Sequence, residues 1–297
     1  MAWLLSAKRN AGAARLRELL QTNQTLAVPG VFNPLSALLA QRAGFDALYI
    51  SGAALSASLG LPDLGVLTMG ELIAAARAII RAAPVPLLVD IDAGYGEALN
   101  ILRLIRELEE VGAAAVQIED QEMPKRCGHL EGKHLISVDE MVERLDAVKL
   151  ARRDLLIIAR TDARGVTNLD DAVARARVYA NIGADIIFPE GLQSADEFAA
   201  FRRALDSPLL ANMTEFGRTP YLSLSQFQSL GYNFVIYPVS GLRLAAKAMV
   251  EGYAALRQAG TLEGMLPQML TRQELYDLIE YAAHEDIARQ CQRMANE

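Results

Sequence analysis

Apolar residues gather in eight short, nearly continuous runs that recur along most of the chain. In order, the runs are Thr25–Gly30, Asp46–Ser51, Pro86–Asp92, Ala114–Asp120, Leu155–Thr161, Asp185–Glu190, Pro208–Met213 and Asn233–Pro238. Runs without apolar–polar alternation are typical of parallel strands that are covered on both faces. We therefore expect eight buried parallel strands.

Amphipathic stretches separate these runs and predict helices between the strands. Clear examples are Glu71–Ala83, Ala98–Val111, Asp139–Ala151 and Asp170–Ile182. Glycine, which readily adopts the left-handed conformation that ends many helices, precedes several of the next strands, at Gly44, Gly112, Gly183 and Gly231. Eight strand–helix units in a chain of this length predict an α/β fold, a single (β/α)8 TIM-type barrel.

A doubly wound open sheet is the alternative arrangement of these strands and helices. Such a sheet normally carries a glycine-rich phosphate-binding turn after its first strand, whereas this chain has Val31-Phe32-Asn33-Pro34 there. Further helical segments are expected near Leu242–Gln258 and Arg272–Gln290. We expect residues 1–297 to form one barrel domain, with a C-terminal helical extension that packs outside the barrel or on a neighbouring subunit.

Composition limits the partners and the location of the protein. Its 297 residues carry a formal net charge of −7, and no basic cluster exceeds a few residues. We therefore expect neither a nucleic acid nor an anionic membrane surface as a partner. The two cysteines lie far apart, no signal peptide is recognisable, and no apolar run approaches the roughly 18 residues of a membrane span. These features predict a cytoplasmic protein.

Acidic residues end two neighbouring strands. Residues two apart in a strand point to the same side, so Asp90 and Asp92 are expected to share one face. Two carboxylates that close together suit Mg²⁺, with Mn²⁺ as the alternative, and Glu119 and Asp120 are candidates for holding metal-bound water. The competing interpretation is that Asp92 caps the following helix.

Other polar residues also stand where strands end, which is where barrel enzymes place their catalytic groups. They are Tyr49, Ser51, Arg160, Asp162, Glu190, Asn212 and Thr214. An arginine fork matches a carboxylate in two places, so Arg160, Arg243 and Arg272 are candidates for binding an anionic substrate. Of these three, only Arg160 is favoured by its position at a strand end over an ordinary surface role.

A long polar segment, Gln121–Ser137, follows the fourth strand and carries one of the two cysteines. Cys127 lies there beside Lys125, Arg126 and His129, and cationic neighbours lower the pKa of a thiol. The segment is longer than an ordinary connection of about 2–6 residues and contains glycines, as lids often do. We expect a reactive thiol on a lid over an anion, with an inert cysteine as the alternative.

Several segments resemble one known superfamily. Lys125-Arg126-Cys127-Gly128-His129 is similar to the signature of the isocitrate lyase and phosphoenolpyruvate mutase superfamily. The segments that resemble its 2-methylisocitrate lyase family are Ser51-Gly52-Ala53, Leu61-Pro62-Asp63, Asp90-Ile91-Asp92, Ile158–Asp162, Phe188-Pro189-Glu190, Asn212–Gly217 and Thr219-Pro220. The resemblance runs in order from about Thr25 to beyond Arg272.

The resemblance implies Mg²⁺-dependent retro-Claisen cleavage of (2S,3R)-2-methylisocitrate into pyruvate and succinate, a step of the methylcitrate cycle of propionate catabolism. It implies that Ser51, Gly52 and Ala53 bind the pyruvoyl part, that Asp90 and Asp92 bind the metal, and that Cys127 and Gly128 meet the succinate part. The remaining substrate-binding residues that it implies are Arg160, Glu190, Asn212, Met213, Thr214, Arg243 and Arg272. Ala53 replaces a glycine of many relatives, and we expect this change to be tolerated.

The implied reaction needs a base, an electrophile and an acid. Mg²⁺ and the arginines would stabilise developing charge, and Cys127 would protonate the succinate carbanion as general acid. Lys125, His129 and Arg160 are further catalytic candidates. Tyr49 and Asp63, the latter through a water, are both candidates for the base, and the sequence leaves this choice open.

Rival interpretations concern the substrate and the assembly. Discrimination between 2-methylisocitrate, isocitrate and 2,3-dimethylmalate depends on space for one methyl group. A phosphonate mutase or an oxaloacetate decarboxylase would leave Cys127 without an obvious role, and a non-catalytic barrel or a thiol redox sensor is a remote alternative. The resemblance also implies a homotetramer in which subunits exchange a C-terminal helix, within Arg272–Gln290.

Overall fold

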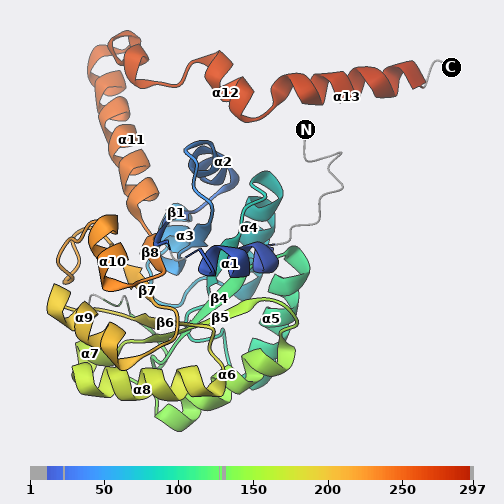
Figure 1. The fold of residues 1–297 in the computed structure, drawn as a ribbon. Coiled ribbons are helices and arrows are strands. Elements are labelled where there is room, and N and C mark those ends of the chain that lie inside the picture. Colours follow the sequence, from blue (N-terminus) through green and yellow to red (C-terminus); the bar gives the residue numbers. More distant parts are fainter. Residues whose placement is uncertain (1–11, 23, 127, 129–131, 295–297) are drawn as a thin grey trace.

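A computed structural model of the chain describes residues 12–22, 24–126, 128 and 132–294. Eight parallel strands curve into a barrel with helices around its outside (Figure 1). The strands are β1 Leu26–Val31, β2 Leu48–Ile50, β3 Leu87–Asp90, β4 Ala115–Glu119, β5 Leu156–Thr161, β6 Ile186–Pro189, β7 Leu210–Asn212 and β8 Phe234–Tyr237. Each lies within one residue of the run that predicts it, so the (β/α)8 expectation is confirmed.

The strand order closes the sheet on itself. Neighbouring strands follow β6-β5-β4-β3-β2-β1-β8-β7, and the remaining gap between β6 and β7 is bridged in parallel between Ile187 and Leu209. The amide of Ile187 also donates to the carbonyl of Pro208 at 2.9 Å. All eight carboxyl ends consequently lie at one end of the barrel, which we call the mouth.

Two apolar layers hold the barrel together, because side chains alternate along each strand. Leu88 of β3 points into the barrel interior with Tyr49 and Phe234, whereas Val89 packs outward against the helices. At the end opposite the mouth, helix α1 (Gly12–Leu20) inserts the fully buried Leu16 into the interior cluster. The amino end of the barrel is therefore closed by apolar packing.

Helices cover the outer layer. They are α2 Pro34–Arg42, α3 Gly52–Ser58, α4 Met69–Ala82, α5 Ala98–Val111, α6 Val138–Ala151, α7 Ala163–Val166, α8 Leu169–Ile182, α9 Ala195–Ala204 and α10 Leu224–Leu230. Gly112, Gly183 and Gly231 end α5, α8 and α10 in the left-handed conformation, as expected. The cap of α2 is instead Ala43, and Gly44 takes its positive φ one residue later. Helix α5 begins after Glu97, so Asp92 does not cap it.

The C-terminal part leaves the barrel as an arm. Helix α11 (Ser240–Ala259) rises from the mouth side, α12 (Arg272–Leu278) contacts α2, and α13 (Tyr281–Met294) extends beyond it (Figure 1). A short 3₁₀ segment, Glu263–Gln268, joins α11 to α12. The expectation of one helix over Arg272–Gln290 is wrong, because Glu280 adopts a φ of 52° and separates two helices. Within the described residues, no helix is both long and apolar enough to cross a membrane.

Gly30 lies where the end of β1 passes close to the backbone that follows β8. A Cβ at this position would lie 2.0 Å from the carbonyl oxygen of Pro238, which follows β8. We expect Gly30→Ala to lower the free energy of unfolding by about 3 kcal/mol, since backbone must move to admit the methyl group. Urea unfolding measures this change. Gly70→Ala in α4, where an added Cβ meets nothing within 4 Å, is the matched control, and equal effects of the two substitutions would contradict the argument.

Candidate functional site

A polar pocket of about 150 Å³ lies at the mouth of the barrel. Side chains from seven of the eight strands, or from the loops that follow them, reach it. The lining residues are Tyr49, Ser51, Ala53, Asp63, Asp90, Glu119, Lys125, Arg126, Gly128, Arg160, Phe188, Glu190, Asn212, Thr214, Ile236, Pro238, Val239 and Arg243. The structure thus brings together most of the residues that the sequence singles out.

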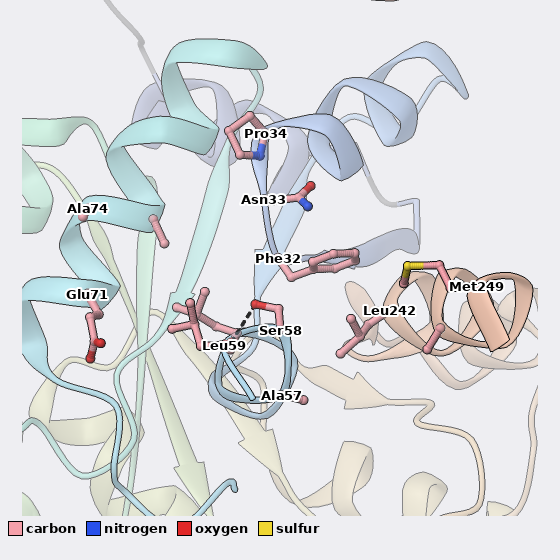
Figure 2. A pocket seen from close by; sticks show the side chains of 13 residues that line it. Phe32, Asn33, Pro34, Ala57, Ser58, Leu59, Glu71, Ala74, Leu242 and Met249 are labelled. Carbon is pink, nitrogen blue, oxygen red and sulfur yellow. Dashed lines mark hydrogen bonds between the residues drawn. The ribbon is translucent and has the colours of Figure 1, made fainter. Parts of the chain in front are cut away.

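A larger cavity, of about 680 Å³, has a different character. It lies on the outside of the barrel between α11 and the segments around α2, α3 and α4, and Phe32, Leu59, Leu242 and Met249 line it (Figure 2). Most of its lining is apolar, and no cluster of ionisable groups faces it among the described residues. The mouth pocket is therefore the candidate active site.

Three carboxylates meet on one side of the mouth pocket. Oxygen atoms of Asp90, Asp92 and Glu119 all lie within 4.8 Å of one another, and all three residues are buried. Asp90 accepts hydrogen bonds at 3.1 Å from the amides of Gly52 and Asp92. A Cβ on Gly52 would approach Asp92 Oδ1 to 3.1 Å, so glycine keeps the start of α3 close to these carboxylates.

This cluster has the properties of a divalent cation site. Glu119 Oε1 is buried and receives no hydrogen bond from any residue that the structure describes. Burial and the adjacent Asp90 raise the pKa of Asp92 to about 7, and burial also raises the pKa of Glu119. Three converging carboxylates with an unused oxygen match the hard oxygen ligands that Mg²⁺ and Mn²⁺ prefer.

Asp120 lies behind the pocket, although it follows Glu119 directly. Its carboxylate accepts hydrogen bonds from Thr161 Oγ1 at 2.8 Å, Tyr179 OH at 2.9 Å and the amide of Asp162 at 2.9 Å. Asp120 therefore joins the ends of β4 and β5 to α8. The expectation that Asp120 holds metal-bound water is not supported by this position, because its oxygens are occupied by protein donors.

Two cations balance the carboxylates. Lys125 Nζ contacts Asp63 and lies 2.8 Å from Asp92 Oδ1, and its side chain is 5% exposed. Burial lowers the pKa of Lys125, but Asp92 and Asp63 raise it more, so the net shift is upward. Arg160 Nη1 lies 3.3 Å from Glu119 Oε2 and 3.8 Å from Glu190 Oε2. Both groups stay charged and act as binding cations rather than as bases.

Asp162 fixes the guanidinium of Arg160. Its oxygens accept from Arg160 Nε at 2.9 Å and Nη2 at 3.1 Å, and Lys133 Nζ donates to Asp162 Oδ1 at 2.7 Å. Although burial opposes ionisation, Arg160 and Lys133 lower the pKa of Asp162 to about 2. The guanidinium also stacks over the Phe188 ring at 5.3 Å. Sequence reasoning assigned no role to Lys133, although it lies in the segment Gln121–Ser137, and it singled out Phe188 only as part of the segment Phe188-Pro189-Glu190.

The opposite wall carries amide and hydroxyl groups. Asn212 Nδ2 donates to Glu190 Oε2 at 3.0 Å, while Asn212 Oδ1 accepts from the amide of Thr214. Arg243, from the start of α11, donates to the carbonyl and the carboxylate of Glu215 at 2.7 and 2.8 Å. Gly128 faces this wall, since a Cβ there would lie 2.5 Å from Glu190 Cγ.

Tyr49 lies beneath the carboxylates as a neutral phenol. Burial and the nearby Asp90 raise the pKa of Tyr49 well above its usual range, and its hydroxyl donates to Gln117 Oε1. A phenol that stays protonated is a poor proton acceptor. Both predicted candidates for the base, Tyr49 and Asp63, line the pocket, and the raised pKa of Tyr49 disfavours it as a proton acceptor.

Some predicted site residues lie elsewhere. Met213 is buried in the core, where its sulfur accepts from the amide of Leu222, and Arg272 begins α12 on the arm. Neither is part of the pocket lining. Cys127 and His129 lie outside the described residues, so the structure does not test their predicted roles.

Known proteins share this fold and sequence pattern. Residues 16–257 match the family model described as Phosphoenolpyruvate phosphomutase. Proteins named 2-methylisocitrate lyase are 51% identical in Aeropyrum pernix, covering 95% of this chain and 92% of theirs, and 47% identical in Bacillus subtilis, covering 96% and 95%. A 2,3-dimethylmalate lyase of Eubacterium barkeri is 43% identical, covering 90% and 93%.

Solved structures agree with these sequence matches. A crystal structure of 2,3-dimethylmalate lyase superposes with a TM-score of 0.90 at 35% identity and covers 96% of both chains. A phosphonopyruvate hydrolase in complex with oxalate and Mg²⁺ superposes with a TM-score of 0.84 at 29% identity, covering 93% of this chain and 97% of that one.

The raised pKa of Asp92 predicts that metal binding depends on pH. Below about pH 7 the Asp92 carboxyl is protonated in the metal-free protein, so a divalent ion must displace that proton. We expect the dissociation constant for Mn²⁺ to decrease about tenfold per pH unit from pH 5.5 to 7 and then to level off. Calorimetric titration at several pH values measures it. Asp92→Asn should weaken binding and remove this dependence, and a constant affinity of the unsubstituted protein from pH 5.5 to 8 would contradict the prediction.

Proposed function

The chain belongs to the phosphoenolpyruvate phosphomutase family, and from that premise we propose that it cleaves 2-methylisocitrate into pyruvate and succinate. The reaction is a retro-Claisen carbon–carbon bond cleavage and would serve propionate catabolism. The observation that carries this proposal is the 47–51% identity to proteins named 2-methylisocitrate lyase, which extends over at least 95% of the chain. A mouth that combines carboxylates with fixed cations suits a substrate with several carboxylates.

Mg²⁺ is the proposed cofactor, held by Asp90 and Asp92 with Glu119 close by. Bound there, the ion would act as a Lewis acid toward the oxygens of the pyruvate half. The amide of Gly52 and the start of α3 adjoin these carboxylates, which supports the proposal that Ser51, Gly52 and Ala53 bind that half of the substrate. The pyruvate half is therefore proposed to bind at the β2 and β3 side of the mouth.

The succinate half is proposed to bind at the opposite side. Arg160, fixed by Asp162, offers its Nη1 toward Glu119 and Glu190, and Asn212, Thr214 and Arg243 complete this wall. Arginine and amide donors held in place before the reaction stabilise charge as it develops on the carboxylate. Gly128 lies against the same wall, which suits its proposed contact with succinate.

Two proton transfers complete the proposed reaction. Asp63 accepts the proton of the substrate C2 hydroxyl through a water, the C2–C3 bond breaks, and its electron pair is left on the succinate carbon. Lys125 contacts Asp63, so this carboxylate is held at the edge of the pocket. Cys127 is proposed to return a proton to the carbon, as a general acid on the segment next to Gly128.

A second candidate substrate is 2,3-dimethylmalate. The observation that favours it is the relative named 2,3-dimethylmalate lyase, 43% identical over 90% of this chain. The two substrates differ at C3, where 2-methylisocitrate carries a carboxymethyl group and 2,3-dimethylmalate carries a methyl group. The polar wall with Arg160, Asn212 and Arg243 would have to pair with the additional carboxylate, and a direct comparison of rates decides between the two substrates.

Pyruvate release is the test of the proposed function. With Mg²⁺ present, we expect 2-methylisocitrate to be turned over with a higher kcat/KM than isocitrate or 2,3-dimethylmalate. Asp90→Asn should abolish activity, and Cys127→Ser should lower kcat at least about 100-fold, since it replaces the general acid. Cys291→Ser is the matched control, because Cys291 is a free and exposed thiol on α13 and should be silent. Faster turnover of another substrate would contradict the proposed substrate.

We also propose that the protein is a homo-oligomer in which the C-terminal arm of one subunit lies on another. Helices α11 and α13 have no buried residue in the single chain, and α11 exposes Leu244, Met249, Val250 and Tyr253. The apolar cavity of Figure 2 borders the same helix. An apolar face and an apolar cavity left uncovered by one subunit are the usual marks of a subunit interface.

Substitutions that introduce charge on the exposed face of α11 test whether this face forms the subunit interface. We expect the unsubstituted protein to exceed the 32.3 kDa of one chain in solution, as measured by light scattering, and to form a homotetramer. Met249→Glu with Tyr253→Glu should reduce the assembly size, because charges would be desolvated in the interface. Lys247→Ala is the control, because Lys247 lies on the same helix as a charged residue paired with Glu251 and does not belong to its exposed apolar face. A monomeric unsubstituted protein would contradict the proposal.

A further inference from the structure

Lys133 is a buried ammonium group that the proposed reaction does not use. Its side chain is 1% exposed, and its Nζ lies 2.7 Å from Oδ1 of Asp162, which is fully buried. Removing two charges from water is costly, and a buried pair is often no more stable than apolar side chains of similar size. The pair therefore calls for an explanation beyond stability.

The ammonium group joins two parts of the mouth. Besides Asp162, Lys133 Nζ donates to the backbone carbonyl of Gly128. Asp162 at the same time accepts two hydrogen bonds from Arg160. One ammonium group thus links the backbone of the segment after β4 to the carboxylate that orients the guanidinium at the end of β5.

The backbone of Gly128 has little space in which to move. A Cβ on Gly128 would lie 2.6 Å from Arg160 Nη2 and 2.5 Å from Glu190 Cγ, so its backbone lies directly against the wall of the pocket. The space around Lys133 is equally restricted, because a Cβ on Gly165 of α7 would come within 3.0 Å of its Nζ. Movement of the ammonium group would therefore move Gly128, Arg160 or both.

We propose that Lys133 is a positioning residue that sets the distance between the Gly128 backbone and the Arg160 guanidinium and so shapes the half of the pocket that receives succinate. The inference rests on the proposed function, which places the succinate half between these two groups. Lys133 does not touch the substrate and acts through Asp162 and Gly128. Asp90 and Asp92, the proposed metal ligands, are contacted by Gly52 and Lys125 instead, so Lys133 reaches the metal site only indirectly, through the contact of Arg160 with Glu119.

The competing interpretation is that Lys133 only neutralises Asp162 and stabilises the fold. The two interpretations differ in what Lys133→Met changes. A positioning role predicts a selective loss of affinity for succinate. A stabilising role predicts either no change in affinity or an equal loss of affinity for succinate and for Mn²⁺. Lys133→Gln keeps a hydrogen-bond donor for Gly128 but not the charge, and it serves the same test if Lys133→Met fails to fold.

The experiment compares succinate and Mn²⁺ binding with turnover in the full-length protein. For Lys133→Met, we expect the dissociation constant for succinate and KM for 2-methylisocitrate to rise at least about tenfold, since small displacements in an active site have effects of about 10- to 100-fold. The dissociation constant for Mn²⁺ should stay within about twofold, as an ion held by Asp90 and Asp92 does not contact this wall. Lys149→Met is the control, because Lys149 forms only an exposed pair with Asp146 on α6 and should change neither.

Unchanged succinate binding in Lys133→Met would overturn the proposal, and so would a parallel loss of succinate and Mn²⁺ binding together with a lower melting temperature. Absence of turnover by the unsubstituted protein would contradict the proposed function alone, because both ligands are measured without turnover. The selective loss of succinate affinity supports the positioning role.

Discussion

The mouth of this barrel depends on one constraint, which is that the buried negative charges of its carboxylates must be balanced. Parallel strands bring the carboxylates of Asp90, Asp92 and Glu119 within 4.8 Å of one another. Such a cluster cannot stay ionised without cations, and Lys125 and Arg160 supply two of them from neighbouring segments. The remaining demand for positive charge makes the cluster suited to the divalent ion that is proposed to bind there.

The sequence was sufficient for the strands and for the strand-end residues. Continuous apolar runs identify buried parallel strands with little ambiguity, and all eight are present. Because such strands end at one edge, charged residues that terminate the runs tend to gather at the mouth, which is why Asp90, Arg160 and Glu190 could be predicted together. Asp90 and Asp92 lie close together as expected, but strand alternation is not the reason, because β3 ends at Asp90 and Asp92 follows it with a φ of 48°.

What the sequence could not provide depends on side-chain direction and on contacts between distant segments. Asp120 differs from Glu119 by one position, yet the alternation of a strand turns it toward Thr161 and Tyr179 instead of the pocket. Lys133 stands in a polar segment like many surface lysines, and only the fold brings it to Asp162. The helix break at Glu280 could not be predicted either, because the left-handed conformation is typical of glycine and nothing in the sequence indicates that a glutamate adopts it.

Because of helix α1, the stability of the fold and the chemistry of the mouth depend on different residues. The helix closes the amino end of the barrel with Leu16, at the end opposite the charged groups of the mouth. The apolar packing at that end therefore involves other residues than those that carry the buried charges. Substitutions in the loops at the mouth can therefore alter chemistry while the folded frame persists. In evolutionary terms, new substrate preferences are accessible through single steps that do not first require the fold to be rebuilt.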